Sequence, residues 1–229
     1  MKIGGLQRVS LIDYPGAICA VVFTQGCNFR CAYCHNPELV DPALFHPALD
    51  ESEFFDFLRA RKGKLDAVVI TGGEPTLHGD LDSFIGRIKK LGYAVKLDTN
   101  GSHPRAVKAL LDKKLLDYIA MDVKAPFERY EEIVRTNVDT NGIQETIGLI
   151  LEAKIPHEFR TTVVRSQLKE KDIRKIAGQI AGADRYVLQK FTPSKTLKEG
   201  FSTEKSYSDE ELEKIKQSLQ AQIPCVVIR

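Results

Sequence analysis

The sequence predicts an α/β fold, a partial and open (β/α)6 barrel built around a mostly parallel sheet. Short apolar segments of strand length alternate at least six times with longer segments of helical periodicity, which is typical of parallel strands joined by crossover helices. Six such units are too few for a closed eight-stranded barrel. The residues that suggest chemistry also follow the carboxyl ends of successive predicted strands, where barrel-type α/β proteins build their sites.

The N-terminal segment is expected to form an edge hairpin and a turn. Small apolar patches separated by two glycines predict a short hairpin within residues 1–12. A turn at residues 12–16 follows, because Pro15 presets φ and Gly16 has a permissive backbone. The apolar run at residues 18–23 is then the first core strand.

The remaining elements follow in alternation along the chain. Asp50 is expected to start a helix with Glu53 at the capping-box position and with Phe54, Phe57 and Leu58 facing inward. Apolar runs predict further strands at residues 67–70, 94–97, 118–121, 158–164, 186–189 and 225–228. Helical stripes predict further helices at residues 81–91, 106–111, 143–151, 172–180 and 209–221.

Length and composition favour a single domain over residues 1–229, with the hairpin and turn in 1–16 and a C-terminal loop, helix and strand in 190–229. The net charge of +2 gives no basic footprint that would require nucleic acid. No apolar run approaches the roughly 20 residues of a membrane span, and no signal-peptide pattern is present. Five cysteines, three of them clustered, suit a reducing compartment. We therefore expect a cytoplasmic protein that binds neither nucleic acid nor a membrane.

Three cysteines, Cys27, Cys31 and Cys34, follow the first core strand within eight residues. Closely spaced thiolates select zinc or iron–sulfur clusters. Both kinds of centre usually take four protein ligands, so three cysteines suggest a 4Fe–4S cluster with one iron left open to another ligand. A zinc site completed by His35 is the alternative reading.

Residues 72–75, Gly-Gly-Glu-Pro, follow the second core strand. Glycines let backbone groups approach a ligand closely, and Glu74 could accept hydrogen bonds from an ammonium group. An ordinary strand-to-helix turn is the alternative for this short motif.

Polar residues, three of them charged, follow the next two strands, with Asp98 and Thr99 after one and Asp122 and Lys124 after the other. Such charges at a barrel mouth are costly unless they are paired or bound to a ligand. Turn chemistry and helix-start carboxylates are the alternatives.

The cysteine spacing, with Tyr33 directly before the last thiol, and the Gly-Gly-Glu-Pro motif together resemble the radical S-adenosylmethionine (SAM) enzymes. Residues 98–101 (Asp-Thr-Asn-Gly) and 122–124 (Asp-Val-Lys) resemble matching stretches of the glycyl-radical-enzyme activases. Within that group the chain resembles most the activating proteins of anaerobic ribonucleoside-triphosphate reductase. The resemblance covers essentially the whole chain and implies the same partial barrel.

The resemblance implies roles for individual residues. It makes Cys27, Cys31 and Cys34 the ligands of the 4Fe–4S cluster. The residues it places at SAM are Tyr33, Gly72, Gly73, Glu74, Asp98, Lys124 and Arg160. Asp98 would lie near the ribose and Lys124 near the methionine carboxylate, while for Arg160 a rim salt bridge is the alternative.

The resemblance implies two further contacts. Asp98, Thr99 and Asp122 would surround a monovalent cation. Asp13 would face the substrate peptide, with a simple turn aspartate as the alternative. The activases often place a histidine after the sixth strand, where this chain has Gln-Lys-Phe-Thr at residues 189–192, so that contact is absent or reassigned.

The implied function is that of an oxidoreductase. One electron from the reduced cluster would cleave SAM to methionine and a 5′-deoxyadenosyl radical, which would take hydrogen from a glycine Cα of a partner glycyl-radical enzyme. A flavodoxin or ferredoxin would supply the electron. The alternatives are an activase of the pyruvate formate-lyase type, a radical SAM enzyme for a modified purine or a cofactor precursor, and a zinc-binding module without catalysis.

Overall fold

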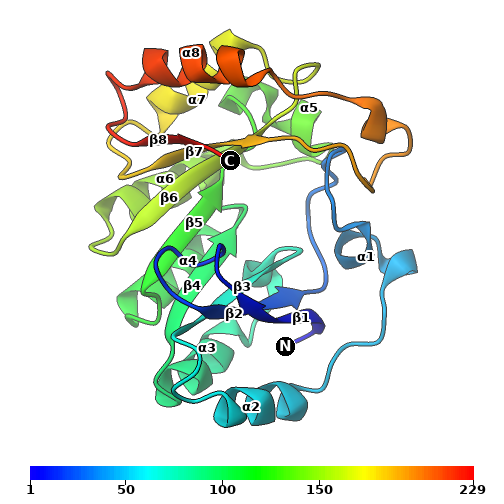
Figure 1. Cartoon of the computed structure of the whole chain (residues 1–229), viewed down its shortest axis with the longest axis vertical. Coiled ribbons are helices and arrows are strands. Elements are labelled where there is room, and N and C mark those ends of the chain that lie inside the picture. The colour runs from blue at the N-terminus through cyan, green and yellow to red at the C-terminus, as the bar shows by residue number, and fades with distance from the viewer. The chain divides into compact units, whose positions relative to one another are not determined.

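The computed structural model describes residues 1–229 and contains one eight-stranded sheet whose strands follow one another in chain order (Figure 1). The strands are β1 (Ile3–Ser10), β2 (Cys19–Thr24), β3 (Ala67–Gly72), β4 (Ala94–Thr99), β5 (Tyr118–Asp122), β6 (His157–Val163), β7 (Tyr186–Lys190) and β8 (Val226–Ile228). β1 is antiparallel to β2. The pairs β2/β3, β3/β4, β6/β7 and β7/β8 are parallel. The predicted α/β class with an open, mostly parallel sheet is confirmed.

Helices occupy most of the connections between the parallel strands. They are α1 (Pro37–Val40), α2 (Glu51–Ala60), α3 (Leu81–Lys90), α4 (Pro104–Asp112), α5 (Tyr130–Val134), α6 (Thr140–Glu152), α7 (Glu170–Gln179) and α8 (Asp209–Leu219). Near the C-terminus, α7 and α8 lie side by side (Figure 1). None of the helices combines the length and the apolar character that crossing a membrane requires.

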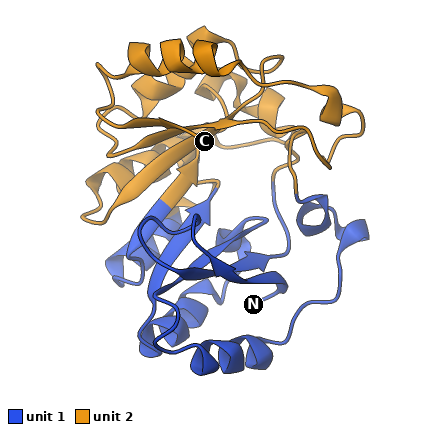
Figure 2. Cartoon of the chain, in the orientation of Figure 1, with its two compact units in different colours: residues 1–28, 36–99, 105–119 blue, residues 29–35, 100–104, 120–229 orange.

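The chain forms two compact units (Figure 2). Unit 1 contains residues 1–28, 36–99 and 105–119, and unit 2 contains residues 29–35, 100–104 and 120–229. Strand β5 begins in unit 1 and ends in unit 2. The single domain expected from the sequence stays a prediction.

The hairpin predicted within residues 1–12 is wrong. β1 is one continuous strand that pairs with β2, and its register shifts between Ile3 and Gly5 and between Gln7 and Ser10. Gly4 does not make a turn: a Cβ at this position would lie 2.6 Å from side-chain atoms of both Gln25 and Leu39. Close packing, which also favours glycine within strands, therefore explains Gly4.

The inward face of α2 differs from the prediction at one position. Phe54 and Leu58 are buried as expected, but Phe55 is buried in place of Phe57. Phe54 stacks on a third ring, Phe84 of α3, and Phe55 meets the same ring edge to face. Phe57 is half-buried, and the guanidinium of Arg8 lies 5.6 Å from its ring centroid, a distance at which a cation–π interaction replaces core packing.

Two short helices, α1 and α5, were not predicted. Pro37 stands at the first position of α1. Its missing N–H costs nothing there, and its fixed φ suits the helix.

An apolar cluster on β2 and β3 organises the core of unit 1. We call it the β2–β3 cluster: Cys19, Val21, Ala67 and Val69. Tyr14 and Ala17, from the turn between β1 and β2, pack against it. The turn is thus fixed to the sheet by buried apolar contacts.

Candidate functional site

In unit 1, a tight turn after β3 holds the Gly-Gly-Glu residues against the segment that leads from β2 to Cys27. The N–H of Gly73 donates to the carbonyl of Thr24 (2.9 Å), and the N–H of Glu74 donates to the carbonyl of Gly26 (2.8 Å). A Cβ on Gly73 would lie 2.0 Å from the Gly26 oxygen. The two backbones can approach this closely only because the residue has no side chain.

The Glu74 carboxylate is fully buried and held by three hydrogen bonds. Its Oε1 accepts from the N–H of Thr76 (3.0 Å), from Oγ1 of Thr76 (2.5 Å) and from Oγ1 of Thr99 (2.7 Å). Thr99 ends β4, so it joins two of the predicted site segments. These bonds fix the carboxylate in one orientation, as an acceptor for a ligand's ammonium group needs.

Replacing Gly73 by alanine is expected to lower the free energy of unfolding by about 1–3 kcal/mol, because the added methyl group meets backbone that cannot move aside. Gly86 of α3 is the matched control, since a Cβ added there would have no atom within 4 Å. Gly86→Ala should raise stability by up to about 1 kcal/mol through helix propensity. Thermal unfolding compares the two, and equal midpoints would contradict the proposed close approach.

Asp98 lies on β4 beside a lysine that the sequence analysis overlooked. Nζ of Lys96 is 3.1 Å from Oδ1 of Asp98 and also donates to the main-chain carbonyl of Asp13 (2.6 Å). The Asp13 carboxylate accepts from the hydroxyl of Ser10 within its own turn. The contact of Asp13 with a substrate peptide stays a prediction.

In unit 2, residues 29–35 carry the second and third cysteines. The N–H of Cys34 donates to the carbonyl of Cys31 (3.1 Å), which closes a turn between the two. Two further hydrogen bonds hold the segment: the N–H of Leu197 donates to the carbonyl of Cys34 (2.9 Å), and the N–H of Lys198 donates to the carbonyl of Ala32 (3.2 Å). Burial raises the pKa of the Cys31 thiol, an effect that a bound metal reverses by removing the proton.

Three charged residues gather next to Tyr33: Asp122 at the end of β5, Lys124 just after it, and Arg160 of β6. Nε of Arg160 donates to Oδ1 of Asp122 (2.7 Å), and Nζ of Lys124 donates to Oδ2 (3.0 Å). Burial by itself would raise the pKa of Asp122, but Arg160 and Lys124 outweigh it and hold this pKa below its ordinary value. Nζ of Lys124 also lies 5.9 Å from the centroid of the Tyr33 ring. Four of the predicted site residues are therefore brought together in unit 2.

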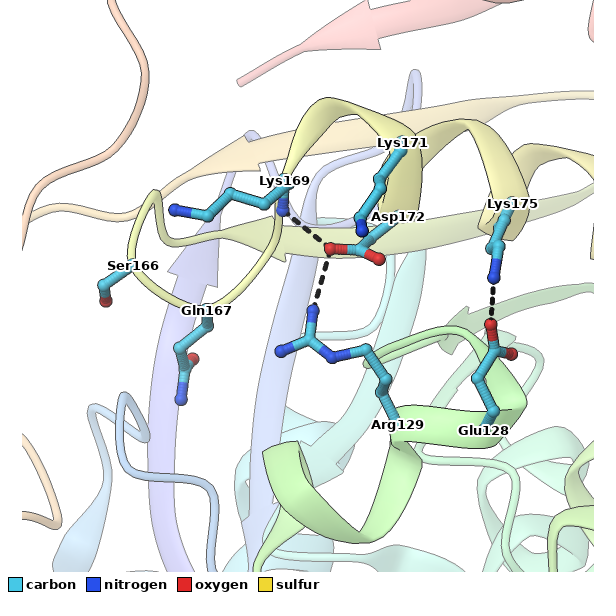
Figure 3. Close-up of a pocket in the computed structure, with 8 residues that line it drawn as sticks. All are labelled: Glu128, Arg129, Ser166, Gln167, Lys169, Lys171, Asp172 and Lys175. Atoms are coloured by element: carbon cyan, nitrogen blue, oxygen red, sulfur yellow. Dashed lines mark hydrogen bonds and ion pairs between the residues drawn. The ribbon is translucent and has the colours of Figure 1, made fainter.

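A cavity of about 410 Å³ lies elsewhere in unit 2, between the 3-10 turn Phe127–Arg129 and α7 (Figure 3). Four of its charged groups form two ion pairs: Nη1 of Arg129 donates to Asp172 (2.8 Å), and Lys175 pairs with Glu128. None of the predicted site residues lines this cavity.

Three residues at the site were missed from the sequence. Thr76 holds Glu74, the Tyr130 hydroxyl accepts from the N–H of Lys124 (3.2 Å), and Lys96 pairs with Asp98. Only Lys96 left a signal, as a lysine within the otherwise apolar run at residues 94–97. The other two depend on turns that no pattern predicts.

Comparison with known proteins shows the family. The model of the "Radical SAM superfamily" matches residues 21–180. A protein of Methanocaldococcus jannaschii carries the name "Putative glycyl-radical enzyme activating enzyme". It is 38% identical to this chain, and the match covers 99% of this chain and 95% of the relative's own length. The chain belongs to the radical SAM superfamily, in its family of glycyl-radical enzyme activating enzymes. This family is of the oxidoreductase type and generates glycyl radicals.

Two further similarities place this activase among its relatives. The pyruvate formate-lyase-activating enzyme of Staphylococcus aureus strain USA300 is 30% identical over 73% of the chain and 70% of its own length. The crystal structure of SuiB of Streptococcus suis bound to S-adenosylmethionine matches with a TM-score of 0.70 at 16% identity. That match covers 91% of this activase but only 49% of the SuiB chain, so it shows the shared fold.

The family implies a 4Fe–4S cluster and SAM as cofactors, and the chemistry of the residues fits both. Thiols suit an iron–sulfur cluster, and Cys27 lies in unit 1 while Cys31 and Cys34 lie in unit 2. Glu74 and Lys124 carry the charges opposite to the ammonium and carboxylate groups of an amino acid.

Proposed function

We propose that this activase generates the glycyl radical of an anaerobic ribonucleoside-triphosphate reductase. The observation that carries the proposal is the match, along nearly the full length of both chains, to a relative named as a glycyl-radical enzyme activating enzyme. The choice of the reductase rests on the resemblance of the whole chain to the activating proteins of that reductase and not on any single residue. A pyruvate formate-lyase is the second candidate partner, because activating enzymes of that lyase also match this chain.

Each predicted residue has a task in this proposal. Cys27, Cys31 and Cys34 are the cluster ligands. Glu74 accepts hydrogen bonds from the SAM ammonium group, and its three threonine contacts keep it in place before SAM binds. Lys124 attracts the SAM carboxylate.

The supporting residues keep these groups oriented. Arg160 holds Asp122, which in turn holds Lys124. Tyr33 packs beside the Lys124 ammonium, and the glycines of the β3 turn hold Glu74 close to the segment that carries Cys27. Asp98 binds the ribose.

When bound, the reduced cluster would supply the electron that cleaves SAM to methionine and a 5′-deoxyadenosyl radical, and this radical would take the hydrogen atom from the partner's glycine Cα. The protein's own residues bind, orient and shield. We propose a flavodoxin or ferredoxin as the reductant. We propose that the reaction takes place in the cytoplasm, because a cluster of three cysteines suits a reducing compartment.

A monovalent cation at Asp98, Thr99 and Asp122 completes the proposal. Asp98 already pairs with Lys96, and Asp122 pairs with Lys124. Because these carboxylates have cationic partners, the cation would act by ordering oxygen ligands and not by balancing charge. Titration of potassium into the cation-free enzyme should tighten SAM binding; a flat titration would remove the cation from the proposal.

Electron paramagnetic resonance tests the choice of partner. The anaerobically reconstituted activase is mixed with SAM, a reductant and either the reductase subunit or pyruvate formate-lyase. A glycyl-radical doublet in the reductase sample is the expected result. A doublet only in the lyase sample would replace the partner, whereas 5′-deoxyadenosine without either doublet would favour a small-molecule substrate.

A further inference from the structure

Lys96 is a buried lysine in the middle of a parallel strand. Only 2% of it is exposed, and lysine is almost never buried this deeply unless it is paired. In the sheet register Lys96 lies beside Val69 of the β2–β3 cluster. An apolar side chain would suit this position without the cost of desolvating a charge. The ammonium group therefore calls for an explanation beyond packing.

The Lys96 ammonium contacts two segments: β4 at Asp98, where SAM is proposed to bind, and the turn at Asp13, which is predicted to face the substrate peptide. It lies 3.1 Å from Oδ1 of Asp98, two residues along the same face of β4. It also donates a 2.6 Å hydrogen bond to the carbonyl of Asp13, in the turn between β1 and β2. The ring of Tyr118 lies 5.6 Å away and adds a cation–π contact. An ammonium with three donors can serve all these directions at once.

The turn that Lys96 contacts is ordered and presents apolar side chains to solvent. The Asp13 N–H donates to the Ser10 hydroxyl, and the Tyr14 ring packs 5.9 Å from that of Tyr118. Leu11 and Ile12, by contrast, are 72% and 81% exposed. Adjacent exposed aliphatic side chains on an ordered turn give an apolar surface that is suited to contact a partner protein.

We propose that Lys96 is a positioning residue that couples SAM binding at Asp98 to partner docking at the turn of residues 11–16. The coupling rests on the proposed function, in which Asp98 binds SAM, and on the contact of Asp13 with the substrate peptide that the sequence predicts. With Lys96 in place, the Asp98 carboxylate is oriented toward one ligand position, and the Asp13 carbonyl is held at a fixed distance from it. Loss of the ammonium releases both segments together.

A double-mutant cycle tests the first half of this coupling. The variants are Lys96→Met, which keeps the length of the side chain, Asp98→Asn, and the double variant, each loaded with its cluster. Lys96→Met should weaken SAM binding about tenfold, a typical magnitude for coupling between sites. In the Asp98→Asn background it should add almost nothing, because Lys96 acts through Asp98. Fully additive losses of SAM affinity would overturn the proposal, because a general structural role of Lys96 would not depend on Asp98.

Hydrogen–deuterium exchange tests the second half without any activity measurement. Amides of residues 11–17 should exchange faster in Lys96→Met than in the wild type. Lys96→Gln retains a donor for the Asp13 carbonyl but no charge, so it should protect the turn and still weaken SAM binding. This variant also serves if Lys96→Met fails to fold. Unchanged exchange in Lys96→Met, or unchanged SAM affinity in Lys96→Gln, would overturn the coupling.

Lys113→Met is the matched control. Lys113 also forms an ion pair in unit 1, 2.5 Å from Asp82 of α3, and more than half of its side chain is exposed. Its removal should change neither SAM affinity nor exchange in the turn. Failure of the proposed function can be told apart from failure of the coupling. A wild type that binds SAM but forms no radical on any partner would contradict the proposed function, and the double-mutant cycle on SAM affinity could still be measured.

Discussion

Alanine at Cys27, Cys31 or Cys34 is expected to abolish assembly of the cluster. In the proposed site each thiolate would hold one iron, and a cluster with three protein ligands would have no spare thiolate to replace a lost one. After anaerobic reconstitution, each variant should contain background iron and sulfide and should lack the visible absorption of the wild type. The loss should be nearly complete and not graded.

Cys19→Ala is the matched control for these variants. Cys19 is a buried thiol on β2, and its Sγ lies 3.6 Å from the carbonyl of Ser10. Its removal should leave iron content unchanged. An intact cluster in any of the three loop variants would contradict the ligand assignment. A colourless wild type with stoichiometric zinc would instead support the zinc-module alternative.

Glu74→Gln is expected to leave the cluster intact and to weaken SAM binding roughly tenfold to a hundredfold, since a hydrogen bond to a charged group contributes about 1.5–3 kcal/mol. Glutamine keeps the shape of the side chain and an oxygen that can accept from Thr76 and Thr99. The variant therefore removes the charge that we propose to face the SAM ammonium group, and little else. Equilibrium binding of SAM to the reconstituted protein gives the affinity.

Glu158→Gln serves as the control for Glu74→Gln. Glu158 is equally buried, on β6, and its carboxylate lies 3.4 Å from the guanidinium of Arg229. Its replacement should affect stability and leave SAM affinity unchanged. Equal affinity of Glu74→Gln and the wild type would show that the Gly-Gly-Glu turn has only a structural role.

The sequence was most informative about the parallel strands. Apolar runs such as residues 67–70 and 118–121 are buried on both faces, and a continuous apolar stretch predicts such strands well. The N-terminal hairpin was wrong because glycines signal both turns and close packing, and only the structure shows that Gly4 packs against Gln25 and Leu39. Phe57 was misplaced because adjacent aromatic residues on α2 fit nearly the same helical stripe.

From the sequence, the candidate site was predictable only for residues that follow the carboxyl ends of predicted strands. The rule that sites form at the carboxyl ends of parallel strands located Glu74, Asp98 and Asp122. It could not reveal which side chains pair across strands. The bond from Thr99 to Glu74 and the ion pair of Lys96 depend on sheet register and on turn geometry, which residue patterns do not encode.

The central claim is that this activase removes hydrogen from a glycine Cα of its partner, and isotope transfer tests it most directly. The reductase subunit is produced with glycine deuterated at Cα and is incubated anaerobically with the reconstituted activase, SAM and reductant. Mass spectrometry of the 5′-deoxyadenosine should show one deuterium gained from the partner. Deuterium-free 5′-deoxyadenosine formed at the same rate with or without the partner would contradict the account.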